Sequence, residues 1–401
     1  MVTVGTTALE DSSRVDFARL RADRRERVLV AMAEHDLDVL LLGREPNAQY
    51  VSGARRLHLA GTRPFGPGCV VVRDGNEVHL LNNWDEGIPP EIPREHLFGI
   101  KWNPLNLVAS LQKIAGLASA KRIGVDSMSP LFLQLIPMAA PDAQIVSAAS
   151  ALRSVRMRKT NDELACIRTA VAVAEASLAQ VMEELRPGVS GKALLGAFEG
   201  HMTGFGVTTP ATEGTFGAAA PVESGHGPRL ARLTTARTID EGALVALSGS
   251  VLYAGYEGGV GRTRVCGGHR GIATSDGVRS LFRRSAELRD RVLDACRPGA
   301  SGEDLATAYT AAGDPLPGFP IAYRVGLGYE GAIAGSALGT SFDATQRLVP
   351  SMALGIETYV ADDDGHGCLM LDTVQVTDDG CERLSTMSCG AGGVEEFRHG
   401  R

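Results

Sequence analysis

The chain has 401 residues, of which 44% are hydrophobic and 22% are charged, and a chain of this length and composition is expected to form two or three domains with cores of their own. Its formal net charge is −7, from 40 basic and 47 acidic residues, which argues against a nucleic-acid partner because such a partner requires a basic face. The 7 cysteines are scattered and contain no C-x-x-C pair, so we expect free thiols in a reducing cytoplasm rather than a disulfide framework or a zinc ribbon.

Neither a signal peptide nor a membrane span is indicated. Residues 1–21 lack the apolar core of a signal peptide. No apolar run reaches the roughly 18 residues that a spanning helix needs. We therefore expect a soluble, cytoplasmic protein with no membrane partner.

The first 150 or so residues alternate between helical and strand patterns, which is typical of an α/β domain. In chain order we expect a charged helix at 14–36, a buried strand at 37–42, a hairpin at 69–81 that turns at Asp74-Gly75-Asn76, a helix at 105–117, a strand at 123–126 and a helix at 129–139. We place this domain at residues 1–152.

The remainder, residues 153–401, contains a repeated helix ending. A long helix with a polar start runs from Thr160 to about Leu185 and stops at the segment 185–191, and a second long helix at 276–295 stops at the similar segment 296–302. Both segments contain Arg-Pro-Gly-x-Ser-Gly, and each opens a shorter helix. The spacing is too long for a solenoid, so we interpret it as pseudo-twofold duplication of an α+β half.

Further motifs follow in a fixed order. They are Lys159 with Glu163, the two Arg-Pro-Gly turns, a hairpin at 239–263 with Gly255-Tyr256 and Arg262-Thr263, the segment 352–359, and Leu371-Asp372-Thr373-Val374 followed by 376–380. This order resembles the pita-bread superfamily of methionine aminopeptidase, prolidase, aminopeptidase P and creatinase over residues 152–390, and the segment 44–53 resembles a motif of its N-terminal domain. The resemblance implies a creatinase-like α/β domain followed by a pita-bread domain with pseudo-twofold symmetry.

Metal enzymes of this superfamily hold two divalent ions with two Asp, one His and two Glu, and the ions activate a bridging water. In this chain the two Asp positions are Ser248 and Gly259, the His position is Leu327, and the two Glu positions are Glu357 and Leu371. Glycine and leucine have no side-chain donor for a metal. The resemblance therefore implies a member without the metal ligands, with no metal and no cofactor. Creatinase, a metal-free relative, implies that the fold can still hydrolyse a C–N bond with a histidine and with glutamates that hold a cationic substrate.

Glu357 and His226 are the catalytic candidates. A lone carboxylate at Glu357 should have a raised pKa or a cationic partner, and we expect Arg262 to be that partner. The two then form either a plain ion pair or a site in which Glu357 receives a substrate ammonium or guanidinium. His226 lies in a glycine-rich loop where relatives have a pocket histidine, and it is either a proton shuttle or an exposed side chain.

Six residues are candidates for substrate binding: Glu213, Tyr256, Glu257, Arg262, Tyr329 and Glu330. The alternative is surface placement for Glu213 and hairpin structure for Tyr256 and Glu257, whereas Tyr329 and Glu330 could face the pocket in place of the histidine. The resemblance also implies a homodimer in which the partner's N-terminal domain approaches the site. Four residues could then reach a neighbouring subunit, or could belong to a solvated basic loop: Arg55, Arg56, His58 and Arg63.

These observations leave three functions open. The first is a metal-independent, creatinase-like enzyme that acts on a small amide, guanidino or amino-acid-derived substrate, by hydrolysis or by a lyase or cyclase step in specialised metabolism. The second is a non-catalytic pseudo-peptidase that binds a peptide or ligand. The third is an Xaa-Pro type metallopeptidase with a displaced metal site. A closed polar pocket would favour the first, and a groove lined by Leu327 and Leu371 the second.

Overall fold

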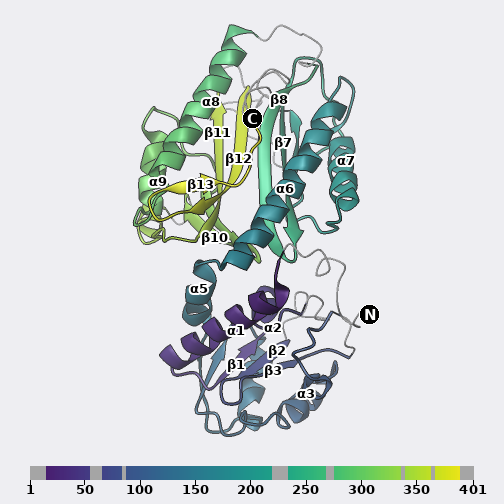
Figure 1. The fold of residues 1–401 in the computed structure, drawn as a ribbon, viewed down its shortest axis with the longest axis vertical. Helices are drawn as coiled ribbons and strands as arrows, with labels where there is room; N and C mark the ends of the chain where they lie inside the picture. The colour runs from purple at the N-terminus through teal and green to yellow at the C-terminus, as the bar shows by residue number, and fades with distance from the viewer. Residues whose placement is uncertain are drawn as a thin grey trace. The chain divides into compact units, whose positions relative to one another are not determined.

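The computed structural model describes residues 15–54, 66–83, 87–218, 234–267, 275–335, 339–362 and 366–388. The chain divides into two compact units between Asp162 and Glu163. The limit expected from the sequence, after residue 152, falls within helix α5 (Ala149–Met157) of the first unit. Each unit has its own sheet (Figure 1).

The first unit is an α/β domain around a five-stranded sheet in the order β3-β2-β1-β4-β5. Strand β4 runs parallel to β1 and β5, whereas β2 and β3 form an antiparallel hairpin at one edge. The elements are α1 (Phe17–Glu34), β1 (Val39–Leu42), α2 (Glu45–Ser52), β2 (Cys69–Val72), β3 (Glu77–Leu80), η2 (Arg94–His96), α3 (Pro104–Leu111), β4 (Arg122–Val125), α4 (Pro130–Leu135), η3 (Ile136–Met138), β5 (Gln144–Ser147) and α5.

Local chemistry explains the helix ends of this unit. Asp16 caps α1 by accepting the Arg19 backbone N–H at 2.9 Å. The helix expected at 129–139 is divided into α4 and the 3-10 turn η3. Pro137 lies in that turn and lacks the N–H that a continuing α-helix would need.

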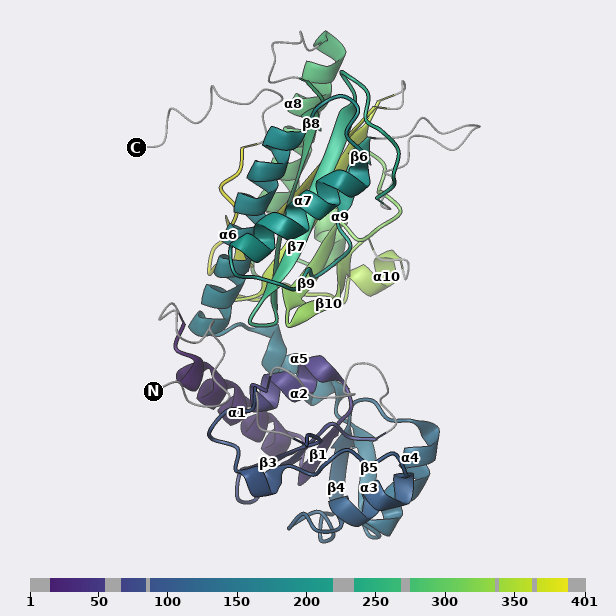
Figure 2. The same ribbon diagram turned by 90° about the vertical axis from the view of Figure 1, so that its right-hand side faces the viewer.

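The second unit is built on an eight-stranded sheet, with β10-β9-β11-β12-β8-β7-β6 in order and β13 paired to β12. Helix α6 packs on β8, and α8 packs on β11 and β12 (Figures 1 and 2). The elements are α6 (Asn161–Glu184), α7 (Gly191–Gly204), β6 (Thr215–Ala218), β7 (Leu244–Tyr253), β8 (Tyr256–Val265), α8 (Asp276–Ala295), α9 (Gly302–Thr310), β9 (Ala322–Gly326), β10 (Gly328–Ala334), α10 (Thr340–Asp343), β11 (Ala353–Ala361), β12 (Gly367–Val376) and β13 (Cys381–Arg383).

Helix α6 is the one helix in the described residues that is long and apolar enough to cross a membrane. However, 56% of its most apolar window is buried inside the structure. A core helix of a globular domain passes the same test, and α6 covers the sheet in this way.

The repeated Arg-Pro-Gly-x-Ser-Gly segments have the same structure in both halves of the second unit. Gly188 and Gly299 both adopt φ +85°, a conformation that favours glycine, and each donates its N–H to a distant carbonyl, at 2.8 and 2.9 Å. Ser190 and Ser301 then cap α7 and α9 by accepting a backbone N–H three residues on. The duplication expected from the sequence therefore appears as two equivalent helix–turn–helix ends.

Candidate active site

Strand register brings one row of residues to a single face of the large sheet. Glu357 on β11 lies opposite Leu371 on β12, which lies opposite Gly261 on β8; Gly261 pairs with Ser248 on β7, and Ser248 with Thr215 on β6. Directly paired residues face the same side of a sheet. We call this side the front face, and helix α6 covers the opposite side. Glu357 is the carboxylate in this row, and it is 5% exposed.

A second row shows how closely β7 and β8 pack at Gly259. Gly259 lies opposite Ser250, and a Cβ on Gly259 would lie 2.0 Å from the Ser250 Oγ and 2.9 Å from its Cβ. The Ser250 side chain therefore occupies the space that a side chain at position 259 would need.

The Thr373 hydroxyl is hydrogen-bonded to the backbone of the same glycine. Its hydroxyl accepts the Gly259 N–H at 3.1 Å and donates to the Gly259 carbonyl at 2.8 Å. Thr263 makes the equivalent pair with Leu369, at 2.8 and 3.2 Å. Strands β8 and β12 are thus joined by threonine hydroxyls on both sides of their direct pairing, which follows the pseudo-twofold relation of the two hairpins.

One apolar side chain lies directly beside Glu357 on this sheet. Leu371, its cross-strand neighbour, is 4% exposed. Leu327 is equally buried but lies further along the strand, because the β9–β11 register places Ile321 next to Glu357. Tyr323 on β9 lies over the glycine at position 355, because a Cβ there would be 2.4 Å from the tyrosine ring. Tyr323 was not among the residues expected from the sequence. Strand alternation alone could not have found it, since its place depends on the β9–β11 register.

Glu257 is the most perturbed carboxyl group of the region. It precedes Gly259 by two residues on β8 and so faces the same side of the sheet, and it is 3% exposed. Burial, and then the negative charge of Glu330, raise the pKa of Glu257 to about 7. Tyr329 is within electrostatic reach of Glu257 and its ring lies 5.4 Å from that of Tyr323. Three predicted substrate residues, Glu257, Tyr329 and Glu330, are therefore brought close together.

Two other predicted substrate residues lie on the opposite side of the sheet. Tyr256 is 1% exposed and its hydroxyl donates to the Glu163 carboxylate on α6 at 2.9 Å. Arg262 has no exposed surface and forms an ion pair with Asp372 at 2.7 Å. Its guanidinium also donates to the carbonyls of Leu371, Met387 and Ser388.

The expected ion pair between Arg262 and Glu357 is therefore wrong. Arg262 follows Gly261 on β8 and so points to the opposite side from the row that contains Glu357. A fully buried guanidinium paired with Asp372 also has no surface to offer a substrate. Its role is to join β8, β12 and the segment after β13.

Of the remaining predicted residues, one is exposed and the others lie outside the described parts of the chain. Glu213 is exposed in the segment before β6. His226 lies outside the described residues, and so do Arg55, Arg56, His58 and Arg63. Their assigned roles stay predictions.

A sequence model of metallopeptidase family M24 matches residues 165–378, more than half of the chain. The chain belongs to this family. The creatinase/prolidase N-terminal domain matches residues 24–158. The predicted fold class, a creatinase-like α/β domain followed by a pita-bread domain, is thereby confirmed.

Known members of the M24 family resemble the chain over nearly its whole length. An Xaa-Pro dipeptidase of Pyrococcus furiosus is 22% identical over 90% of this chain and 97% of that protein, and a creatinase of a Bacillus species is 22% identical over 92% and 90%. Among solved structures, the prolidase from Pyrococcus horikoshii has a TM-score of 0.71 at 18% identity, covering 91% of this chain and 99% of that one. The dipeptidase PepE from Mycobacterium ulcerans has a TM-score of 0.68 at 20% identity, covering 95% and 99%. These structural likenesses show the fold.

Proposed function

We propose that this protein is a metal-independent hydrolase of the M24 family that cleaves a C–N bond in a small amide, guanidino or amino-acid-derived substrate. The observation that carries the proposal is the composition of the front face. Where the resembling metal enzymes have ligands, this chain has Ser248, Gly259, Leu327 and Leu371, and it keeps one carboxylate, Glu357.

The residues at these positions do not fit a pair of divalent ions. Glycine and leucine offer no donor atom, and a hard dication selects several carboxylate or carbonyl oxygens. The side chain of Ser250 fills the space next to Gly259. Among the residues that the structure describes, the one group of three His, Cys, Asp or Glu side chains close enough to share an ion lies in the first unit, at Glu77.

The chemistry we assign needs an anchor and a proton carrier. Glu357, buried beside apolar Leu371, anchors a cationic substrate group such as an ammonium or a guanidinium. Glu257, with a pKa raised to about 7, is partly protonated at neutral pH and can exchange a proton there. Water adds to the carbon of the C–N bond, its proton passes by way of the carrier to the nitrogen, and the C–N bond breaks. His226 is the second proton carrier in this proposal.

The similarity to a creatinase supports a guanidino substrate, and the similarity to Xaa-Pro dipeptidases supports a dipeptide. The test is hydrolysis of creatine, related guanidino acids and a panel of Xaa-Pro dipeptides by the full chain, before and after chelation. We expect turnover that survives chelation, and its loss by at least about 100-fold in Glu357→Gln with unchanged circular dichroism. Turnover that disappears on chelation and returns with Mn²⁺ or Co²⁺ would contradict metal independence, and full activity of Glu357→Gln would contradict the anchor.

A non-catalytic binding protein is the second candidate, because Leu371 makes the surroundings of Glu357 partly apolar. It predicts a retained ligand and no turnover of any substrate in the panel. The homodimer and the cytoplasmic location expected from the sequence belong to the same proposal. Light scattering after size exclusion tests the dimer, and cell fractionation tests the location.

A further inference from the structure

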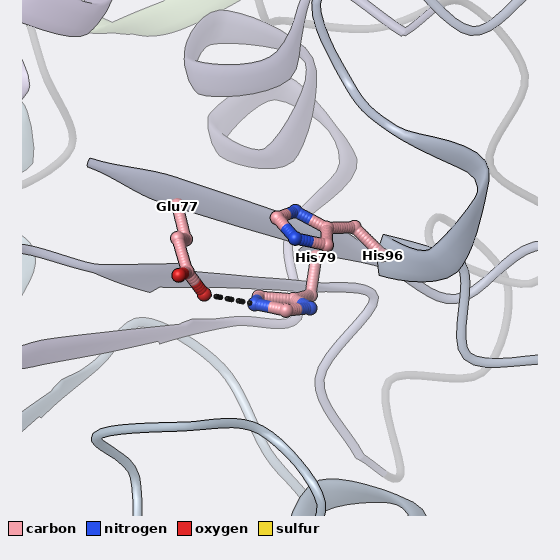
Figure 3. Close-up of side chains that lie close together, drawn as sticks. All are labelled: Glu77, His79 and His96. Carbon is pink, nitrogen blue, oxygen red and sulfur yellow. Dashed lines mark hydrogen bonds and ion pairs between the residues drawn. The ribbon is translucent and has the colours of Figure 1, made fainter. Parts of the chain in front are cut away.

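Three side chains converge at the edge of the sheet in the first unit, far along the sequence from the candidate active site. Glu77 and His79 come from the edge strand β3, and His96 comes from the 3-10 turn η2 (Figure 3). One potential ligand atom from each lies within 4.8 Å of the other two. No part of the proposed hydrolysis uses these residues.

The backbone explains why they meet. Glu77 and His79 are two residues apart on β3 and so face the same side of the sheet. The chain that follows η2 continues alongside the same strand, because Leu97 forms a bridge with Leu80, and Phe98 donates its N–H to the Leu80 carbonyl at 2.9 Å. This pairing places η2, with His96 at its end, over the face that carries Glu77 and His79.

Hydrogen bonds hold the two imidazoles beside the strand that carries Glu77. His96 Nδ1 contacts the Val78 carbonyl oxygen at 3.2 Å. A carbonyl oxygen only accepts, so Nδ1 carries a proton and Nε2 is the nitrogen left to bind a metal. His79 Nε2 lies 3.0 Å from Glu77 Oε2 and donates its proton to that carboxylate, so a metal bound there takes the place of this proton.

The two imidazole rings lie against each other. The His79 and His96 rings are stacked, with centroids 4.1 Å apart and planes 23° apart. His79 is 8% exposed, and Val70 and Val72, opposite on β2, belong to the apolar core.

We propose that Glu77, His79 and His96 form a binding site for one divalent transition-metal ion, for which Zn²⁺ is the best match. Two imidazole nitrogens and one carboxylate oxygen are a common three-ligand set for zinc, with water in the fourth position. Stacked rings point their in-plane lone pairs side by side, so coordination requires the partly exposed His96 ring to rotate toward Glu77. The bound ion clamps the segment after η2 onto the edge of the sheet and stabilises the first unit.

The test uses the full chain, stripped with chelator and titrated with Zn²⁺ in competition with a chromophoric chelator, and with Co²⁺ to record the visible spectrum of the site. We expect one equivalent bound with tetrahedral Co²⁺ bands, and affinity weakened at least about 10-fold in His96→Gln and in Glu77→Gln. His201→Gln is the matched control, because His201 pairs with Glu184 at 2.7 Å without a third ligand. Its affinity should equal that of the unmodified chain.

Glu357→Gln separates this site from the second unit, and it should also bind one equivalent. Metal binding that Glu357→Gln abolishes and His96→Gln leaves intact would overturn the proposal, and so would the absence of Zn²⁺ binding at micromolar concentration. Both variants in the first unit change partly exposed side chains, so folding should survive. Zn²⁺ should also raise the apparent Tm of the unmodified chain and leave that of His96→Gln unchanged; an equal rise in both places the ion elsewhere.

Discussion

The close packing of Ser250 against Gly259 predicts a change of sign in the effect of one substitution. A Cβ added at Gly259 would lie 2.0 Å from Ser250 Oγ, 2.9 Å from Ser250 Cβ and 3.3 Å from the carbonyl at position 249. Rotation of the serine can move its Oγ, but its Cβ is fixed by the backbone, so the two strands must shift. Gly259→Ala should therefore destabilise the unmodified chain by about 1–3 kcal/mol, the usual cost of overpacking.

The same substitution should behave differently after Ser250→Gly. Both contacts below 3 Å are then gone, and the carbonyl contact at 3.3 Å can be relieved by small shifts. Gly259 lies within β8 and is not among the glycines with positive φ, so alanine fits its backbone. Replacing glycine there reduces the entropy of the unfolded chain, which stabilises by about 0.4–1 kcal/mol. The coupling free energy between the two positions is thus expected at about 1.5–4 kcal/mol. Gly259→Ala destabilises the unmodified chain and stabilises the Ser250→Gly variant.

The assay must report on the second unit. Both tryptophans, Trp84 and Trp102, belong to the first unit, so intrinsic tryptophan fluorescence would miss the effect. Hydrogen exchange of peptides covering 244–265, measured by mass spectrometry, gives the local opening free energy directly. Far-UV circular dichroism checks that all four chains are folded. Equal costs of Gly259→Ala in both backgrounds would refute the idea that the Ser250 side chain occupies the space beside Gly259.

Two further substitutions test the charges. Glu257 has a folded pKa of about 7, above the ordinary 4.5. Its contribution to the free energy of unfolding is therefore fully present below about pH 4.5, and about 3 kcal/mol of it is lost as pH rises to 7. Glu257→Gln should remove that loss when denaturation is measured at both pH values, and an unchanged pH dependence would contradict the raised pKa. Asp372→Asn leaves the buried Arg262 without its counter-charge and should cost about 3–5 kcal/mol. The double variant Arg262→Met with Asp372→Leu should cost less, and a larger loss in urea denaturation would contradict a charge-based explanation.

Local turn and capping chemistry made part of the fold predictable. Gly188 and Gly299 end their helices because each needs a positive φ, and this requirement is visible in the sequence. Helix lengths in the first unit were harder to predict, because tertiary contacts determine where a helix with a weak sequence pattern ends. The helix expected at 105–117, for example, ends at Leu111.

The orientation of Arg262 was partly predictable. Glu257 and Arg262 are an odd number of residues apart on one strand, so they face opposite sides of the sheet. Whether Arg262 could meet Glu357 depends on the β8–β12–β11 register, which no local pattern contains. The raised pKa of Glu257 likewise depends on its burial, and then on Glu330, which a separate strand brings near. The sequence identifies the candidate residues of the site, and the pairing of strands determines which of them lie close together.

A second carboxylate opposite Glu357 should destabilise this protein. Leu371→Glu would place a second carboxylate directly opposite Glu357, in a row whose other members are Gly261, Ser248 and Thr215. Like charges at directly opposite positions repel, and burial strengthens the effect by raising the pKa of one of the two groups above its unfolded value. The variant should therefore be less stable than the isosteric control Leu371→Gln.

The difference between Leu371→Glu and Leu371→Gln should be small below about pH 4 and should grow as pH rises through the raised pKa. Mn²⁺ or Co²⁺ should not remove it, because Gly259 and Leu327 still provide no ligands. Thermal unfolding of both variants at pH 5 and pH 8, with and without Mn²⁺, measures this directly. Full rescue of Leu371→Glu by the metal, with two equivalents bound, would mean that the front face still accommodates the ion pair. A pH-dependent loss that metal leaves unchanged would mean that this part of the front face is a packed surface that does not bind the ions.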